Sequence, residues 1–487
     1  MSELDRMAMA VLQPGFDGLE PPGWLRRALA DGLGGVVLFA RNVAGLDGTA
    51  ALVAELRRER PDVVVAVDEE GGSVTRLEAA TGSSWPGNMA LGVAGEESLT
   101  RRVGRQIGRM VAAAGITLDY APVVDVNADP RNPVIGVRSF GSDPEAVGRH
   151  GAAWIEGLQS AGVAACAKHF PGHGDTVTDS HLALPAVRAS REVIERRDLP
   201  PFRAAVAAGV RAVMCGHLLV PAVDVLPATL SRAVLTGLLR EELGFEGLVV
   251  TDAIEMRAVA ALHPPGEIAV RALAAGADAI CVGVSSARGE SVYALRDAIT
   301  SAVREGRLAE ERLAEAAGRV RDLAAWYDAQ AEAREAVARD ADEGLGLAAA
   351  TAALRATPAE PAGSLTRAPL VVRMAARPSQ AVGRATPVTL GEALGEILPG
   401  TATIEVDDDG HLPDLSEAGR PLVIAVHDAV RHAWMRRLLD EALRARPDAV
   451  VVETGVPGPP AGRLYLATHG SSTASARAAA RWLTGAA

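Results

Sequence analysis

Short apolar runs recur eight times within the first 290 residues of the chain. Most of these runs are continuous rather than alternating, which is typical of strands buried on both faces of a parallel sheet. Amphipathic stretches with helical periodicity separate most of the runs. The expected strands are residues 8–13, 35–39, 63–68, 116–120, 163–167, 212–216, 248–252 and 279–283, and the expected helices include residues 49–60, 98–114, 144–161, 192–208 and 231–243.

Strand–helix alternation repeated eight times predicts a (β/α)8 barrel of the TIM type. An open, doubly wound sheet is the structural alternative. That alternative lacks support because no Gly-x-Gly-x-x-Gly fingerprint follows an early strand. A helical region at 290–339 completes the expected barrel domain, residues 1–340.

A second pattern follows the barrel. Residues 341–368 are expected to form a helical and Pro/Ala/Gly-rich linker, with the Pro/Ala/Gly-rich part at 356–364. Five further strands (370–374, 402–406, 422–426, 449–453 and 464–467) alternate with helices at 390–397, 429–445 and 473–483. Residues 369–487 are therefore predicted to form a small α/β sandwich domain, whose role the sequence leaves open.

Charge and composition exclude several functions. The net charge is −12 and there is no basic run, which disfavours binding to nucleic acid or to an anionic membrane. The chain shows no secretory signal and no apolar stretch of the roughly 18 residues that a spanning helix requires, so a cytoplasmic location is expected. Cys166, Cys215 and Cys281 each lie in an apolar run and are predicted to be buried thiols.

The chain contains a single lysine, Lys168, among 49 basic residues. This lysine opens the run KHFPGHGDTVTDSH, which ends at His181 and holds three histidines together with Asp175 and Asp179. A planar guanidinium cannot replace a compact ammonium between oxygens, so the position of this lysine indicates a specific requirement. A cluster of titratable groups on a Gly/Pro-rich loop is typical of a functional site.

Charged or imidazole side chains also follow other expected strands. In a barrel, function lies at the carboxyl ends of the strands. Five of the eight strands lead into such groups, which include Asp68, Asp125, Lys168, His217 and Asp252. Asp252 directly follows an apolar strand and is the candidate nucleophile, with a structural ion pair as the alternative.

Asp179 and His181 are the candidate acid/base pair. Residues two apart on an extended loop point the same way, so the carboxylate can accept the imidazole N–H. The other ring nitrogen is then available for proton transfer near neutral pH.

A metal site was the competing interpretation of this cluster. Pro171, Gly172 and Gly174 disfavour the helix that a His169–His173 pair of ligands would need, and Lys168 would repel a cation. No metal and no cofactor are therefore expected. The ligands considered were His169, His173, Asp175, Asp179, His181 and His217.

Several motifs together resemble the bacterial β-N-acetylglucosaminidases of glycoside hydrolase family 3. They are KHFPGHGDTVTDSH at 168–181, VDEEGGSVTR at 67–76, APVVDV at 121–126, GVRS at 136–139 and TDAIEM at 251–256. The resemblance covers about the first 330 residues. Thr251 is a mild departure, because serine usually precedes the nucleophile of this family.

The resemblance implies a retaining, exo-acting glycosidase in which Asp252 attacks the anomeric carbon. His181, held by Asp179, would protonate the leaving oxygen and later activate water. The implied substrates are β-linked GlcNAc glycosides such as peptidoglycan-derived fragments. The implied sugar-binding residues are Asp68, Arg76, Arg138, Lys168 and His169, whereas His173 is expected to support the loop.

Other functions remain open from the sequence. A neutral imidazole does not repel an anion as a carboxylate would, so phosphate is a possible acceptor and the enzyme a possible phosphorylase. A β-glucosidase is disfavoured because it would lack the loop with Asp179 and His181. A metal-dependent hydrolase and a non-catalytic sugar-binding protein are the remaining alternatives. The second domain could serve binding or dimerisation, for which residues 469–472 are the candidate loop, but a structural role is favoured.

Overall fold

A computed structural model describes the chain except for residues 284–287, 360–364, 377–386, 409, 416–418 and 487. The chain forms two compact units. Unit 1 comprises Met1–Glu69, Thr100–Ala128 and Ser142–Ala341, and unit 2 comprises Glu70–Leu99, Asp129–Gly141 and Asp342–Ala487. Unit 2 thus includes two segments that the sequence analysis places in the barrel domain.

Contacts inside unit 2 explain why those two segments belong to it. The Thr473 hydroxyl donates to the Thr81 carbonyl over 2.7 Å, and Arg431 donates to the Asn132 carbonyl over 3.3 Å. The domain division at residues 340 and 369 remains a prediction of the sequence.

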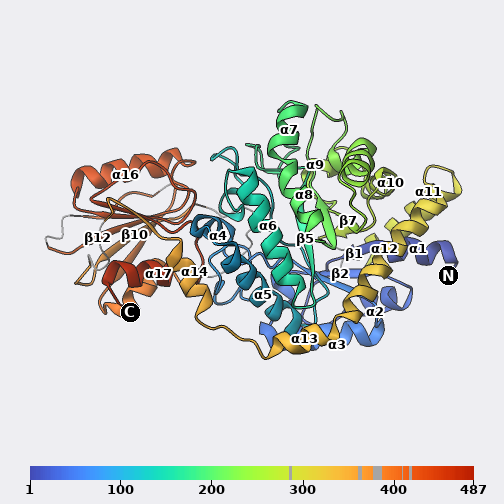
Figure 1. Ribbon diagram of the computed structural model, residues 1–487, viewed down its shortest axis with the longest axis horizontal. Coiled ribbons are helices and arrows are strands. Elements are labelled where there is room, and N and C mark those ends of the chain that lie inside the picture. Colours follow the sequence, from blue (N-terminus) through green and yellow to red (C-terminus); the bar gives the residue numbers. More distant parts are fainter. Residues whose placement is uncertain (284–287, 360–364, 377–386, 409, 416–418, 487) are drawn as a thin grey trace. The chain divides into compact units, whose positions relative to one another are not determined.

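Unit 1 is built on eight parallel strands (Figure 1). Six of them form a sheet in the order β2-β3-β4-β5-β6-β7, and β1 pairs with β8. Isolated parallel bridges at Gly15–Val37 and Val250–Ala279 link the two-stranded sheet to β2 and to β7. The bounds are β1 Leu12–Pro14, β2 Gly35–Leu38, β3 Val64–Val67, β4 Leu118–Asp119, β5 Ala164–Phe170, β6 Ala212–Cys215, β7 Leu248–Thr251 and β8 Ile280–Val282.

Helices separate these strands along the chain. They are α1 Glu3–Ala10, α2 Gly23–Ala30, α3 Gly45–Glu59, α5 Glu97–Ala113, α6 Pro144–Gln159, α7 Arg191–Arg197, α8 Leu199–Ala207, α9 Arg257–Ala260, α10 Pro265–Ala275, α11 Glu290–Arg304, α12 Glu310–Ala329 and α13 Ala331–Ala338. A π-helix spans Ala233–Glu242.

Two of the expected elements in unit 1 differ from the prediction. Residues 8–10 are helical rather than extended, because Ser2 and Asp5 form a capping box that starts α1. The single helix expected at 192–208 is two helices that meet at Asp198, since Pro200 and Pro201 lack the N–H groups that a continuing helix would need.

One core cluster of unit 1 joins apolar strand residues to the facing side of α12. Alternate residues of β3, β5 and β7, such as Val64, Cys166 and Val250, pack with Val320 of α12. All three cysteines are buried and unpaired, as predicted. Burial raises the pKa of the Cys215 thiol to about 12, so this thiol is inert at neutral pH.

Unit 2 has a six-stranded mixed sheet in the order β11-β10-β12-β13-β14-β9, in which only β9 is antiparallel to its neighbour. Helix α16 packs on one face, and α15 and α17 pack on the other. The bounds are β9 Arg355–Thr357, β10 Leu370–Met374, β11 Ala402–Val406, β12 Leu422–Val426, β13 Val450–Glu453, β14 Leu464–Ala467, α4 Asn88–Ala94, α14 Leu345–Ala352, α15 Leu390–Ile397, α16 Ala433–Ala445 and α17 Thr473–Thr484. The five strands predicted after residue 368 are confirmed.

The predicted linker is partly structured. Helix α14 and strand β9 both lie within residues 341–368, and β9 pairs with β14. Residues 360–364 of the Pro/Ala/Gly-rich stretch lie outside the described residues.

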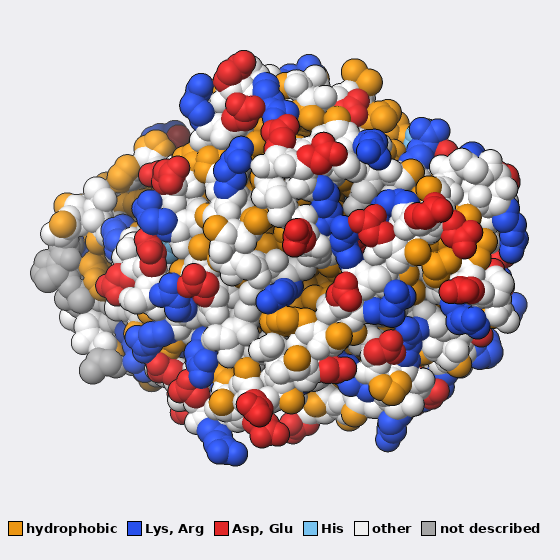
Figure 2. Space-filling view, turned by 45° about the vertical axis from the view of Figure 1, so that its right-hand side comes forward, with side chains coloured by type: hydrophobic (Ala, Val, Ile, Leu, Met, Phe, Trp, Pro, Cys, Tyr) orange, Lys and Arg blue, Asp and Glu red, His pale blue; other side chains and the backbone are white. Residues whose placement is uncertain are grey.

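Acidic and basic side chains are interspersed over the face of the molecule in Figure 2. In the part of the chain that the structure describes, no helix is both long enough and apolar enough to cross a membrane.

Candidate active site

The carboxyl ends of the unit 1 strands carry the polar side chains that the sequence singles out. Asp68 directly follows β3, and Asp252 directly follows β7. Lys168 and His169 lie near the end of β5, and His217 follows β6 by two residues. Because the carboxyl ends of parallel strands meet at one edge, these side chains gather there.

Lys168 forms a buried ion pair with Asp68. Its Nζ atom donates to Oδ1 of Asp68 over 2.7 Å, and the lysine side chain is only 2% exposed. A buried ammonium is costly unless it is paired. The pair explains why this chain keeps one lysine at this position, since an ammonium is a more compact donor than a guanidinium.

The end of β5 is irregular, and two consecutive side chains there each contact an aspartate. The register with β6 shifts between Lys168 and Phe170. Consecutive residues of a regular strand point to opposite faces. Here Lys168 reaches Asp68, while His169 Nδ1 lies 2.7 Å from Oδ2 of Asp125.

Asp125 is a buried acceptor that organises this edge. It accepts the backbone N–H of His169 over 3.2 Å and that of His173 over 2.6 Å, in addition to the His169 ring. Burial alone would raise the pKa of Asp125, but the His169 and His173 imidazoles and N–H groups hold that pKa below its usual value. An ionised carboxylate only accepts hydrogen bonds, so His169 carries a proton on Nδ1.

His173 supports the loop that follows β5, as predicted. Its ring nitrogens lie 2.8 Å from the Thr176 hydroxyl and 3.2 Å from the Ser180 hydroxyl. Only glycine fits at position 174, because a Cβ there would lie 1.7 Å from the Val126 carbonyl oxygen. The loop is therefore fixed from inside, just before Asp179 and His181.

Asp179 and His181 form the pair that the sequence predicts. His181 Nδ1 lies 2.8 Å from Oδ1 of Asp179, and the His181 backbone N–H donates to the same oxygen over 2.9 Å. Burial would raise the pKa of Asp179, but these bonds from His181 lower it. The ionised carboxylate fixes the Nδ1–H tautomer, so proton exchange with a substrate falls to Nε2.

Asp252 is held as a carboxylate. Its Oδ1 atom accepts the N–H of Ala253 over 2.8 Å. Burial would raise the pKa of Asp252, but the imidazoles of His217, His169 and His181 hold it below its usual value. An ionised carboxylate is the form that a nucleophile requires.

His217 contacts the backbone beside Asp252. Its Nε2 atom lies 3.0 Å from the Ala253 carbonyl oxygen, and Nδ1 lies 2.8 Å from the Thr229 hydroxyl. Burial lowers the pKa of His217, which favours the neutral ring. A carbonyl only accepts, so Nε2 carries the proton, while the Thr229 hydroxyl lies within reach of both Nδ1 and the Gly216 carbonyl oxygen, 3.2 Å away.

Arg76 and Arg138 belong to unit 2. Arg138 pairs with Glu70 through Nε and Nη2, at 2.9 and 2.7 Å, and both side chains are buried. Arg76 is 7% exposed. The sequence analysis missed Glu70 as a partner, although the adjacent acids Glu69 and Glu70 in the VDEEGG motif were a visible signal.

Neither the role of Asp125 nor the link between His217 and Asp252 follows from the sequence. Both roles depend on loop contacts between different strands, which local patterns do not specify. Within the described residues, no group of three or more His, Cys, Asp or Glu side chains is arranged to hold a metal ion.

Comparison with known proteins identifies the family of this chain. Residues 25–323 match the Glycosyl hydrolase family 3 N terminal domain. Relatives include a beta-hexosaminidase of Methylococcus capsulatus, which is 38% identical over 251 residues that cover 51% of this chain and 75% of that protein. Beta-hexosaminidase A of Pseudoalteromonas piscicida is 36% identical over 268 residues, and the match covers 50% of this chain but only 45% of that protein.

A solved structure extends the likeness to both units. The glycoside hydrolase family 3 beta-N-acetylglucosaminidase from Paenibacillus sp. str. FPU-7 is 35% identical, with a TM-score of 0.88, over 100% of this chain and 97% of that one. The chain belongs to glycoside hydrolase family 3.

Proposed function

We propose that the protein is a β-N-acetylglucosaminidase that removes terminal β-linked GlcNAc from its substrates by a retaining mechanism. The observation that carries this proposal is the Asp179–His181 pair, held on a fixed loop of the unit whose β7 leads directly into Asp252. The relatives named as beta-hexosaminidases and the beta-N-acetylglucosaminidase of similar structure support the sugar specificity.

The eight parallel strands of unit 1 are proposed to close into a (β/α)8 barrel. The bridges at Gly15–Val37 and Val250–Ala279 support this closure, because they join the β1–β8 pair to both edges of the six-stranded sheet. Residues 1–340 and 369–487 are proposed as the folding domains.

The first chemical step forms a bond between Asp252 and the sugar. A carboxylate oxygen of Asp252 attacks the anomeric carbon, and the bond from that carbon to the leaving oxygen breaks. Nε2 of the protonated His181 gives its proton to the leaving oxygen, which departs as an alcohol. The ionised Asp179 stabilises the imidazolium before this transfer.

The second step releases the sugar with its anomeric configuration retained. Neutral His181 takes a proton from water at Nε2 while the water oxygen attacks the anomeric carbon. The bond to Asp252 breaks and the carboxylate is restored. Two inversions at one carbon give overall retention.

The residues proposed to bind the terminal sugar are those of the family motifs. Asp68, Lys168 and His169 belong to unit 1, where the Lys168–Asp68 pair offers both a donor and an acceptor to hydroxyl groups. Arg76 and Arg138 are the proposed residues of unit 2. Peptidoglycan-derived and chitin-type fragments are the proposed substrates, and no metal ion is assigned a part in either step.

The test compares wild type with Asp252→Asn and His181→Ala on a GlcNAc-β-1,4-linked disaccharide, with and without phosphate. Wild type is expected to release β-GlcNAc first, as NMR of the early product will show. Asp252→Asn is expected to fall to background, and His181→Ala by about 10²–10⁴-fold. His411→Ala is the control, because His411 is an exposed histidine of unit 2.

Different outcomes would redirect the proposal. Full activity of Asp252→Asn would remove the nucleophile assignment. Release of α-GlcNAc as the first product would exclude retention, GlcNAc 1-phosphate in the phosphate sample would make the enzyme a phosphorylase, and loss of activity with a chelator would favour a metal-dependent hydrolase.

A further inference from the structure

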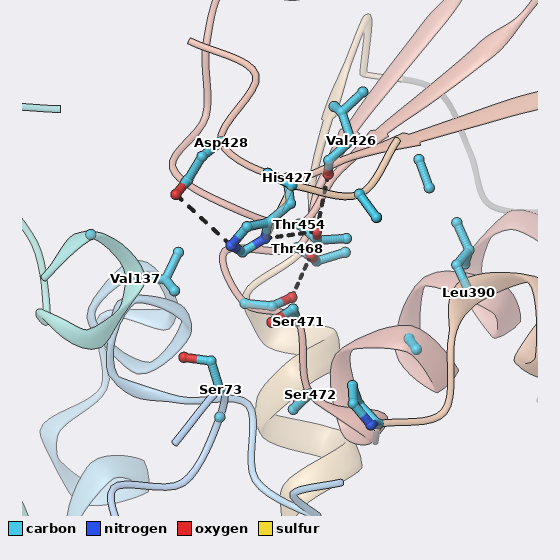
Figure 3. Close-up of a pocket in the computed structure, with 18 of the residues that line it drawn as sticks. Ser73, Val137, Leu390, Val426, His427, Asp428, Thr454, Thr468, Ser471 and Ser472 are labelled. Atoms are coloured by element: carbon cyan, nitrogen blue, oxygen red, sulfur yellow. Dashed lines mark hydrogen bonds and ion pairs between the residues drawn. The ribbon is translucent and has the colours of Figure 1, made fainter. Parts of the chain in front are cut away.

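Unit 2 contains a cavity of about 260 Å³ whose lining includes Arg138 but not Asp179, His181 or Asp252 (Figure 3). The cavity is lined by residues after β10, β12, β13 and β14, including Ala376, His427, Thr454 and Thr468. All lining residues belong to unit 2.

The topology of the sheet predicts a ligand at this place. The chain runs from β10 outward to β11 on one side and then returns to β12, β13 and β14 on the other side. The order therefore reverses between β10 and β12, and in open α/β sheets ligands bind at the carboxyl edge where this reversal occurs. Met374 ends β10 and Val426 ends β12, and both line the cavity.

The backbone at this edge is strained and firmly held. Asp428 and His469, which have φ of 54° and 55°, are the non-glycine residues with positive φ in the described part of the chain. They follow β12 and β14. The buried Glu453 carboxylate accepts the N–H groups of Asp428, Ala429 and Gly455 at 2.9, 3.1 and 2.6 Å. Strain maintained by such contacts is typical of binding sites.

Hydrogen bonds define how His427 meets the cavity. The Thr454 hydroxyl donates to the Val426 carbonyl over 3.0 Å, so the Thr454 oxygen accepts the Nδ1–H of His427 over 3.1 Å. Nε2 lies 3.8 Å from Oδ2 of Asp428, which is beyond hydrogen-bond distance. The His427 side chain is 38% exposed, so Nε2 is accessible to a ligand.

Charges around the cavity favour an anion. Among the described residues that line it are three arginines and two histidines but one carboxylate, that of Asp428. Arg138 and Arg373 already pair with Glu70 and Glu405. Arg431 binds Oδ2 of Asp428 and the Asn132 carbonyl through Nη1 alone, and a guanidinium has five N–H donors. Arg431 therefore neutralises Asp428 and retains donors on Nε and Nη2.

We propose that this cavity binds a monosaccharide-sized molecule that carries one carboxylate or phosphate group. Arg431 donates to the anionic group, and His427 Nε2 accepts a hydrogen bond from a ligand hydroxyl. The Ser73, Thr468 and Ser471 hydroxyls contact the other hydroxyl groups of the ligand. The volume suits one sugar ring, because pockets for larger ligands hold roughly 300–1,000 Å³. Among the described residues that line the cavity, Arg138 is also proposed above to bind the sugar, but it pairs with Glu70 and is given no part in holding the anion. The proposal therefore does not depend on the proposed function.

The test measures binding of three probes to the full chain by calorimetry: glucuronate, glucose 6-phosphate and neutral glucose. At least one anionic probe is expected to bind at least tenfold more tightly than glucose. His427→Ala and Arg431→Gln are expected to weaken that binding at least fivefold, whereas His411→Ala leaves it unchanged. Ser471→Trp fills the cavity from a loop and is expected to abolish binding. It replaces either of the other variants if that variant folds poorly.

Asp252→Asn separates this site from the proposed active site, and anionic binding is expected to persist in it. The proposal is overturned if none of the anionic probes binds, if glucose binds equally well, or if folded His427→Ala and Ser471→Trp bind as wild type does. Binding that Asp252→Asn abolishes would place the ligand in unit 1 and would also overturn it. A variant that loses hydrolysis but still binds the anionic probe would contradict neither the cavity proposal nor its test. Failure of one proposal can therefore be told apart from failure of the other.

Discussion

At the scale of single residues, the proposed active site depends on fixed tautomers. Asp125 fixes a proton on Nδ1 of His169, and Asp179 fixes one on Nδ1 of His181. His217 differs, because the Ala253 carbonyl requires the proton on Nε2. Each ring has a defined donor and acceptor before substrate arrives, which reduces the reorganisation needed during reaction.

His217→Gln tests whether this histidine positions the nucleophile. The ring holds the peptide that follows Asp252 by its bond to the Ala253 carbonyl. We expect kcat to fall about 10–100-fold, because small misplacements of a reacting group are costly. KM should change less than threefold, because His217 is not assigned to the sugar. Thr229→Val removes the hydroxyl that contacts Nδ1 and should give a smaller loss of kcat. A fall in thermal stability without loss of kcat would indicate a purely structural role.

His181→Ala tests proton donation by comparing two substrates. An aryl glycoside has a leaving group that departs without protonation, whereas a disaccharide does not. The loss of activity should therefore be about 10²–10⁴-fold on the disaccharide and much smaller in the first step of the aryl substrate. Pre-steady-state release of the aryl group measures that step. Equal losses on both substrates would argue against His181 as the acid.

At the scale of elements, the loop after β5 determines whether Asp179 and His181 are held in place. Gly174 approaches the backbone of Val126 so closely that a side chain does not fit. Gly174→Ala should therefore move the loop and reduce kcat on the disaccharide at least tenfold. Gly344→Ala is the matched control, because a Cβ at Gly344 would meet nothing within 4 Å. Wild-type activity of Gly174→Ala would show that the loop tolerates the shift.

The junction of α7 and α8 predicts a pH effect on stability. Burial raises the pKa of Asp198 to about 6, although Arg197 opposes the shift. A folded-state pKa above the unfolded value stabilises the protein at low pH, and that contribution is lost as pH rises from about 4 to about 6. The loss is on the order of 3 kcal/mol at most.

Asp198→Asn cannot titrate, so the free energy of unfolding of this variant should rise relative to that of wild type as pH increases from 4 to 6. Denaturant unfolding at several pH values measures this slope. Asp62→Asn should leave this slope nearly unchanged. Burial opposes the shift, but the bond from Arg60 lowers the pKa of Asp62, so the stability that this aspartate contributes is lost only as pH falls below about 4.

Elements built from apolar runs were predictable from the sequence, and those built from caps and contacts were not. The strands at 370–374, 402–406 and 422–426 agree residue for residue, because continuous apolar runs mark buried parallel strands. Residues 8–10 were misassigned because Ala and Met suit either state and the capping box at Ser2 decides. Asp179 and His181 were predictable because their contact is local, two residues apart.

At the scale of the whole molecule, long-range contacts limited what the sequence revealed. Residues 70–99 and 129–141 belong to unit 2 through contacts with residues far along the chain, such as Thr81 with Thr473, 392 positions away. No local pattern encodes such contacts. The cavity of unit 2 escaped prediction for the same reason, since His427, Thr454 and Thr468 follow three separate strands.

The single lysine provides a probe of the folded state of the whole chain. Lys168 is 2% exposed and paired with Asp68, and no other lysine competes for amine reagents. A succinimidyl ester should therefore modify the α-amino group of the native protein while Lys168 stays unmodified, as peptide mass spectrometry will show. In denaturant Lys168 should react fully, and at intermediate concentrations its modification should follow the unfolded fraction. Fast modification of Lys168 in the native protein would mean that this edge of unit 1 opens without global unfolding.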